Sequence, residues 1–166
     1  SGVSTFIVVG TDILRQQIPA FNQRLTFLFG PVMRQKEANG PAGVSYLVVG
    51  VSILVFIFPK IIVTHVLYFQ ALADPLASYY GIKYGKDKIA EGKSLQGTAA
   101  AFVVCTLVSL LYFFAQEIML DRIIVVSLIA GILGAVSEMV NVANLDDNFT
   151  LPVLSAGSLW GLYYVF

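Results

Sequence analysis

Long apolar runs alternate with short polar segments along most of the chain, and this alternation predicts its elements. The apolar runs cover residues 43–58, 61–80, 98–115, 123–143 and 150–166. A helix needs about 20 apolar residues to cross a bilayer, with a lower limit near 17. Residues 3–10 add an apolar piece that is too short to span alone. We therefore predict an all-α, polytopic membrane helix bundle of about five spans plus a partial N-terminal helix.

Polar segments separate these spans. Residues 11–42 are mixed in character, and Pro19 and Pro31 should interrupt any long helix there; part of this region is expected to lie on the membrane surface. Residues 81–97 are rich in glycine and lysine, and residues 144–148 carry acids and amides. Following the spans alternately places all three segments on one side, with eight of the ten basic residues. This excess of lysine and arginine predicts that the shared side is cytoplasmic.

The composition supports a single integral membrane domain over residues 1–166. Hydrophobic residues make up 57% of the chain and charged residues only 12%, against about 25% charged in ordinary globular proteins. The formal net charge is zero, and no basic surface interleaved with aromatic residues suggests a nucleic-acid partner. The single cysteine excludes a disulfide within the chain.

Asp74 lies in the last third of a predicted span. An acid within a span costs roughly 2.5–3.5 kcal/mol on insertion scales, so it is usually paired or functional. A Mg²⁺ ligand is one interpretation, because Mg²⁺ prefers carboxylate oxygen and substrate phosphate. A salt bridge to a lysine of the next loop is the other.

That loop holds four lysines and four glycines within residues 81–97. Glycines allow backbone N–H groups to approach a phosphate, and lysines neutralise its charge. The loop is not a Walker A motif, since three residues rather than four separate Gly81 from Gly85-Lys86, and Asp87 follows. An ordinary basic loop that contacts anionic lipid head groups remains an equal alternative.

Glu138, Asn141 and Asn144 recur every three residues and place a polar stripe on the fourth predicted span. Acids and amides follow directly at Asp146 and Asp147. These residues could hold a cation-bound nucleotide or a substrate hydroxyl. Hydrogen bonding between packed helices is the competing explanation for the stripe.

Four motifs, in this order, resemble those of the CTP-dependent lipid kinases, a family related to the phosphatidate cytidylyltransferase-like membrane enzymes. They are Met33-Arg34-Gln35-Lys36-Glu37; Asp74-Pro75-Leu76-Ala77-Ser78 with Gly81-Ile82-Lys83-Tyr84-Gly85; Lys93-Ser94-Leu95-Gln96-Gly97-Thr98; and Asp146-Asp147-Asn148-Phe149-Thr150-Leu151-Pro152-Val153-Leu154-Ser155. The last motif most resembles the diacylglycerol kinase branch. In the family a further helix with a basic motif precedes this region, so an N-terminal helix is expected to be missing from residues 1–166. Pro75 departs from the small polar residue of that branch.

The resemblance implies transfer of the γ-phosphate of CTP to the hydroxyl of a membrane lipid, most closely diacylglycerol, with Mg²⁺ or another divalent cation. It implies Asp74, Asp146 and Asp147 as metal ligands and Asp74, Asp147 and Glu138 as catalytic residues, with Asp147 or Glu138 as general base. The implied nucleotide site consists of Gly81, Lys83, Gly85, Lys86, Lys88, Lys93, Ser94, Gly97 and Thr98. Accessory positions are Arg34, Lys36, Glu37, Asn148 and Thr150.

Several alternatives stay open. A prenol or prenyl-phosphate kinase would use dolichol, phytol or geranylgeraniol, and a cytidylyltransferase would release pyrophosphate instead of CDP. A small transporter with Asp74 and Glu138 on its path should have polar residues spread through the depth of the membrane, whereas here they gather near one face. The expected membrane is the endoplasmic reticulum or nuclear membrane in a eukaryote and the inner membrane in a bacterium. A homodimer is left open.

Overall fold

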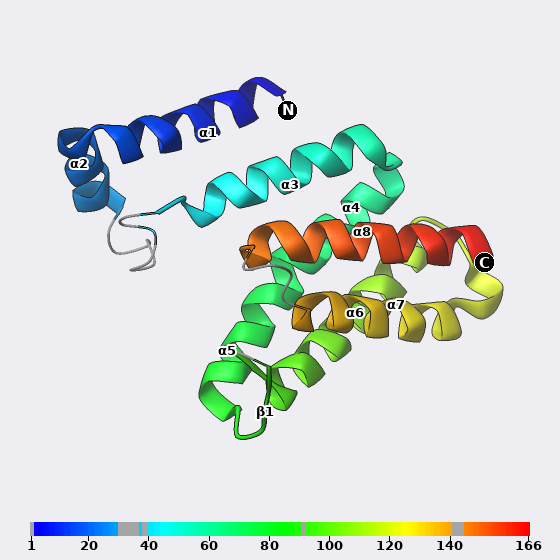
Figure 1. Ribbon diagram of the computed structural model, residues 1–166. Coiled ribbons are helices and arrows are strands. Elements are labelled where there is room, and N and C mark those ends of the chain that lie inside the picture. Colours follow the sequence, from blue (N-terminus) through cyan, green and yellow to red (C-terminus); the bar gives the residue numbers. More distant parts are fainter. Residues whose placement is uncertain (1, 30–36, 38–39, 91, 141–144) are drawn as a thin grey trace.

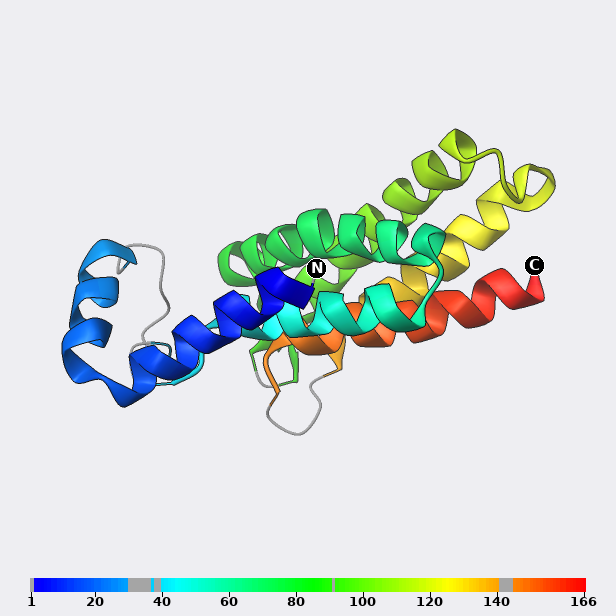
Figure 2. The same cartoon turned by 90° about the horizontal axis from the view of Figure 1, so that it is seen from above.

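The chain folds into a bundle of helices with one small β-hairpin (Figures 1 and 2). The structure, a computed structural model, describes residues 2–29, 37, 40–90, 92–140 and 145–166. In chain order the elements are α1 (Gly2–Gln17), α2 (Pro19–Phe29), α3 (Gly43–Ile57), α4 (Lys60–Tyr68), a π-helical turn (Phe69–Ala73), α5 (Asp74–Tyr84), β1 (Lys88–Ala90), β2 (Lys93–Ser94), α6 (Leu95–Ala115), a 3-10 turn (Leu120–Arg122), α7 (Ile123–Met139) and α8 (Asp147–Val165).

Within the described ranges, three stretches of helix are long and apolar enough to cross a membrane, judged by length and composition. They are Lys60–Tyr84 with 25 residues, Leu95–Ala115 with 21 and Leu120–Met139 with 20, and Gly43–Ile57 is a shorter apolar helix. The predicted fold class, an all-α membrane bundle, is confirmed. The predicted boundaries differ by a few residues, because capped polar residues extend helices beyond their apolar runs. Asp146, for example, caps α8 and starts it three residues before the predicted position.

The second predicted span is one continuous helix with a π-helical turn in its middle. The backbone N–H of Asp74 donates to the carbonyl of Phe69, five residues earlier, where an α-helix would use the residue four earlier. Pro75 follows directly and supplies no backbone N–H to the continuous helix. Asp74 therefore lies directly after the π-turn, where the helix changes its angular register, and such π-turns are frequent at functional sites.

The N-terminal region is more helical than the hydrophobic pattern predicts. Helix α1 continues through polar residues to Gln17, well past the apolar piece that ends at Gly10. The reason is a buried ion pair one helical turn apart, in which Arg15 Nη2 lies 2.7 Å from Asp12 Oδ1. The predicted break at Pro19 is confirmed, since α2 begins there; Pro31 lies outside the described residues.

Small residues bring α6 and α7 close together. A Cβ on Gly134 would lie only 2.6 Å from Cys105 Sγ, and one on Gly131 would lie 3.0 Å from Thr106 Cβ. His65 joins α4 to this pair from within the core, with its Nε2 2.9 Å from Ser109 Oγ. This packing aligns the C-terminal end of α7 with the N-terminal end of α6, where polar residues gather.

Candidate active site

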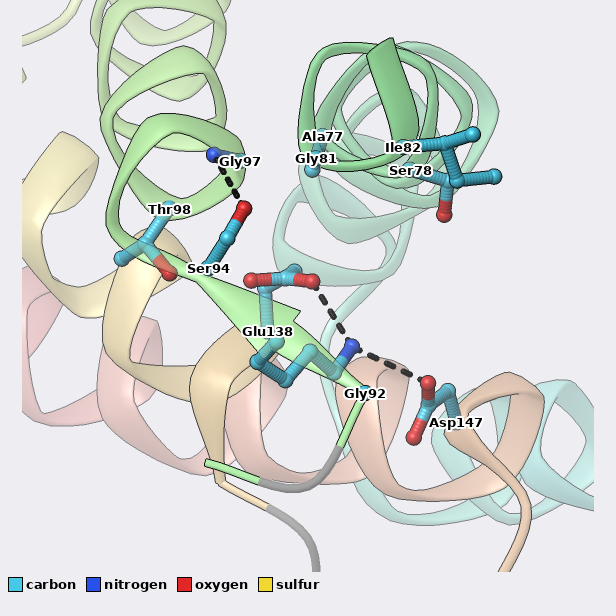
Figure 3. Close-up of a pocket in the computed structure, with 11 residues that line it drawn as sticks. Ala77, Ser78, Gly81, Ile82, Gly92, Ser94, Gly97, Thr98, Glu138 and Asp147 are labelled. Carbon is cyan, nitrogen blue, oxygen red and sulfur yellow. Dashed lines mark hydrogen bonds and ion pairs between the residues drawn. The ribbon is translucent and has the colours of Figure 1, made fainter. Parts of the chain in front are cut away.

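A polar pocket of about 210 Å³ lies at the end of the bundle where α5, the hairpin, α6, α7 and α8 meet (Figure 3). Its position follows from the helix ends: α5 and α7 finish there, and α6 and α8 begin there. The residues that line it are Ala77, Ser78, Gly81, Ile82, Gly92, Lys93, Ser94, Gly97, Thr98, Glu138 and Asp147. The pocket thus combines residues from three of the four motifs.

Lys93 contacts two carboxylates of this pocket, those of Glu138 and Asp147, and dashed lines in Figure 3 mark both contacts. Its Nζ lies 2.7 Å from Glu138 Oε1 and 3.0 Å from Asp147 Oδ2. The side chains of Lys93 and Glu138 are only 11% and 5% exposed, whereas that of Asp147 is 36% exposed. One ammonium and two carboxylates leave the trio with one net negative charge.

The charge state of Lys93 follows from these neighbours. Burial by itself would lower the pKa of Lys93, but the hydrogen bond and negative charge of Glu138, and then those of Asp147, raise it above its ordinary value. The ammonium form is therefore held at neutral pH. A fixed positive charge beside carboxylates can contact an anionic group while the carboxylates contact a cation.

The glycines of the basic motif allow α5 to pack against the start of α6. A Cβ on Gly97 would lie 2.9 Å from the carbonyl oxygen of Ala77, and one on Gly85 would lie 2.6 Å from Ser94 Oγ. Ser94 caps α6 by accepting a hydrogen bond from the Gly97 N–H, at 3.2 Å. These glycines thus have a packing role, and the predicted contact of their backbone with phosphate stays a prediction.

The structure separates the four lysines of the basic motif. The turn at Gly92, with φ +74°, lets β2 pair with β1 and carries Lys93 into the pocket. Lys83, Lys86 and Lys88 do not line the pocket and are exposed. Lys83 Nζ donates instead to Tyr79 Oη at 2.8 Å on the outside of α5.

A second polar cluster surrounds the first residue of α3. A Cβ on Gly43 would lie 2.8 Å from Asn148 Nδ2, 3.1 Å from Glu37 Oε1 and 3.8 Å from Asp146 Oδ1. Asn148 Nδ2 also donates to Asp146 Oδ1 at 2.8 Å. Glu37 and Asp146 are buried, so the first and last of the four motifs meet here.

Asp74 is connected to this second cluster through Gln70. Gln70 Nε2 donates to Asp74 Oδ2 at 3.3 Å and to Asn148 Oδ1 at 3.4 Å. Asp74 does not line the pocket around Lys93. The start of α8 connects the pocket around Lys93 with the polar cluster around Gly43, because Asp147 lines the pocket and Asn148 belongs to the cluster.

Three residues that hold the site together were not predicted from the sequence. Gln70 lies four residues before Asp74, a spacing that brings side chains together on a helix. Asp12 and Arg15 were missed as a pair: Arg15 donates to the carbonyl oxygens of Glu37 and Gly40, each at 2.7 Å, and Asp12 Oδ2 accepts from the Ala42 N–H at 3.0 Å. Their Asp-x-x-Arg spacing was the available signal.

The remaining predicted site residues are placed as follows. Thr98 lines the pocket, and its Oγ1 is buried without a hydrogen-bond partner in the described part of the chain. Thr150 is buried in the first turns of α8. Arg34, Lys36, Asn141 and Asn144 lie outside the described residues.

The fold and the pocket together define a helical membrane protein with a charged site at one end of the bundle. Comparison with known proteins narrows this class. CTP-dependent diacylglycerol kinase 1 of Schizosaccharomyces pombe is 35% identical over 159 residues, which are 90% of this chain and 73% of the relative. The kinases of the same name from Saccharomyces cerevisiae and Eremothecium gossypii are 30% and 33% identical over 87% of this chain.

The chain therefore belongs to the family of CTP-dependent diacylglycerol kinases, and the predicted resemblance to CTP-dependent lipid kinases is confirmed. It spans 57% and 52% of the lengths of the Saccharomyces and Eremothecium relatives. No family model matches the chain. No solved structure matches it either.

Proposed function

We propose that this chain transfers the γ-phosphate of CTP to the hydroxyl of diacylglycerol and so forms phosphatidate. The kinases to which it is similar support the donor and the lipid, and they favour diacylglycerol over the prenol substrates. The observation that carries the proposal is Lys93, held between Glu138 and Asp147 in a pocket at the end of a membrane bundle. Phosphoryl transfer depends mainly on positioning and charge neutralisation, and this arrangement can provide both.

Lys93 would contact the triphosphate. Its ammonium group is kept charged, and it lies at the start of α6, where free backbone N–H groups also favour an anion. Lys83, Lys86 and Lys88 are exposed on the same end of the bundle. We assign them to attracting the nucleotide, because surface charges raise association rates without direct contact.

Mg²⁺ fits the oxygen atoms of the pocket. Glu138 Oε2 and Thr98 Oγ1 are both buried and lack hydrogen-bond partners among the residues described. Mg²⁺ is usually held by one or two carboxylates together with substrate phosphates, and Glu138 would supply a carboxylate oxygen. Asp147 as a ligand stays a prediction, because we assign its carboxylate to proton transfer. The bound cation would neutralise the phosphate oxygens. In the described ranges no group of three His, Cys, Asp or Glu residues forms a metal site, so Asp74 and Asp146 as ligands stay predictions.

Asp147 is our choice for the base that receives the proton of the lipid hydroxyl. Its side chain is the most accessible of the trio, at 36% exposed, whereas Glu138 is buried against Lys93. As the hydroxyl oxygen forms its bond to the γ-phosphorus, the bond from that phosphorus to the bridging oxygen breaks and CDP leaves. The proton passes to a carboxylate oxygen of Asp147. Asp146 and Asn148, on either side of Asp147 in the chain, would position the glycerol.

We further propose that residues 1–166 act as one catalytic domain whose polar end faces the cytoplasm. Eight of the ten basic residues lie in the segments assigned to that side. In a eukaryote the membrane would be that of the endoplasmic reticulum or nucleus.

The proposal is tested by incubating the purified protein with γ-labelled CTP, Mg²⁺ and a panel of diacylglycerol, dolichol and phytol. We expect labelled phosphatidate and CDP. Release of pyrophosphate instead of CDP would indicate a cytidylyltransferase. Label found only in dolichol or phytol would indicate a prenol kinase. The variant Asp147→Asn should give no labelled lipid and so sets the background. If the unaltered protein gives no more labelled lipid than this variant, the kinase proposal is overturned.

A further inference from the structure

An apolar groove of about 400 Å³ lies between α1 and α3, which run side by side in Figures 1 and 2. Nearly all of its lining is apolar, and the side chains that matter here are Phe6, Val9, Ile13, Val49 and Phe56. The hydroxyls of Thr5 and Ser52 hydrogen-bond to each other at 2.5 Å. The groove therefore suits a ligand that has no hydrogen-bonding groups of its own.

One end of the groove reaches the polar residues of the candidate site. Ile13 lines it and directly follows Asp12, whose carboxylate accepts from the Ala42 N–H at 3.0 Å. The next residue, Gly43, begins α3 and packs against Asn148. The Ile13 end of the groove therefore lies next in the chain to Asp12, whose contact with Ala42 leads to the polar cluster at Gly43.

The dimensions of the groove indicate what could occupy it. Its lining on α1 runs from Gly2 to Ile13, which at 1.5 Å per residue is roughly 16 Å. This is about half of the ~30 Å hydrocarbon core, the depth of one leaflet. An acyl chain from one leaflet matches this length, and its lack of polar atoms matches the apolar lining.

We propose that this groove holds one acyl chain of the diacylglycerol substrate and so presents the glycerol hydroxyl at the Gly43 end. The inference rests on the proposed function for the identity of the lipid. An acyl chain held here brings the head group beside Asp146 and Asn148, while Asp147 faces the nucleotide pocket. The groove would then determine preference for long acyl chains, independently of CTP binding.

The test fills the groove at Gly10. This residue lines it, and a Cβ built there meets no heavy atom within 4 Å, so Gly10→Leu adds bulk without a clash and raises helix propensity. Gly157→Leu is the matched control, because Gly157 also has open space around its Cβ but lies on α8 away from the groove. Both variants are compared with the unaltered protein on dioleoylglycerol and on dihexanoylglycerol.

We expect Gly10→Leu to raise KM for dioleoylglycerol about fivefold, the low end of the cost of overpacking, because the displaced chain moves into lipid rather than water. KM for dihexanoylglycerol and for CTP should stay unchanged, and Gly157→Leu should have no effect. An equal change for both lipids, or no change for either, would overturn the inference.

A second measurement does not depend on catalysis. A diacylglycerol with a diazirine in the middle of one acyl chain is cross-linked to the protein, and the labelled peptides are mapped. We expect label on α1 and α3 and its loss in Gly10→Leu. Label elsewhere would contradict the groove proposal even if the kinase is active. Label in the groove of a protein that makes no phosphatidate would refute only the proposed function.

Discussion

Replacing Lys93 with methionine removes the ammonium group that lies between Glu138 and Asp147 while keeping most of the volume of the side chain. Glu138 then stays in its buried position, 5% exposed, without the partner that now lies 2.7 Å from Oε1. Its other oxygen, Oε2, already lacks a hydrogen-bond partner among the described residues. The substitution therefore leaves a buried charge without compensation.

The expected cost follows from the burial of the trio. Removing one partner of a fully buried ion pair costs about 3–5 kcal/mol. Asp147 is 36% exposed and water can screen it, so we expect a destabilisation of about 2–3 kcal/mol. For a chain of this size each kcal/mol lowers Tm by about 2–4 °C, which predicts a decrease of about 5–10 °C.

Cys105 provides the assay. It is the single cysteine of the chain and is 1% exposed in the core, so a thiol-reactive fluorogenic dye labels it only when the bundle opens. Heating the detergent-solubilised protein with this dye gives Tm for the unaltered protein, for Lys93→Met and for the double variant Lys93→Met/Glu138→Gln. The neutral amide has no charge to bury, so the double variant should regain at least half of the lost Tm.

Activity should separate from stability in the same series. Lys93→Met and the double variant should both lose CTP-dependent phosphorylation, because neither has the ammonium group that contacts the triphosphate. If the Tm of Lys93→Met stayed within about 2 °C of that of the unaltered protein, the substitution would cost less than about one kcal/mol of stability. The buried trio of Lys93, Glu138 and Asp147 would then not form. A double variant less stable than Lys93→Met would refute the same reasoning.

Three further predictions concern the same end of the bundle. Gly97→Ala places a Cβ 2.9 Å from the carbonyl of Ala77, which should separate α5 from α6 and lower Tm by several degrees, whereas Gly157→Ala, with open space around its Cβ, should not lower it. The pKa of Lys93 in the folded protein is raised above the ordinary value of 10.5. The stabilisation by its ammonium group should therefore be complete below pH 10.5 and disappear as pH rises through the folded pKa. The Tm difference between the unaltered protein and Lys93→Met should stay constant from pH 7 to about 10 and shrink above that. Asp74→Asn retains an oxygen that can accept the neighbouring amide, at 3.3 Å, so Tm should hold while labelled-CTP turnover drops about a hundredfold or more; full turnover would remove Asp74 from the site.

Hydrophobic runs were enough to predict the long apolar helices, because burial in lipid demands apolar length and little else. They could not give the end of α1. That end depends on the pairing of Asp12 with Arg15 and on the carbonyls that Arg15 binds, and these contacts are made between segments distant in the sequence.

The candidate site was predicted as four motifs, but composition could not rank the lysines within one motif. Lys93 differs from Lys83, Lys86 and Lys88 only by a hairpin turn at Gly92 that directs it inward. Gln70 was missed because a single amide in an apolar run has little weight alone. Its contacts to Asp74 and Asn148 depend on how α8 packs against the π-turn, which one sequence does not specify.

The π-helical turn divides the helix Lys60–Tyr84 into two halves that can be oriented separately. His65 and Val66 fix the first half within the core, and Asp74 begins the half that carries the site. A π-turn holds about one residue more than an α-turn, so converting Phe69–Ala73 to regular α-helix without removing a residue would rotate everything after it by roughly 100°. That rotation would turn Asp74, Ala77 and Gly81 away from their partners without altering the first half of the helix. The extra residue in this turn thus sets the angular position of the site independently of the length of helix that the bilayer requires.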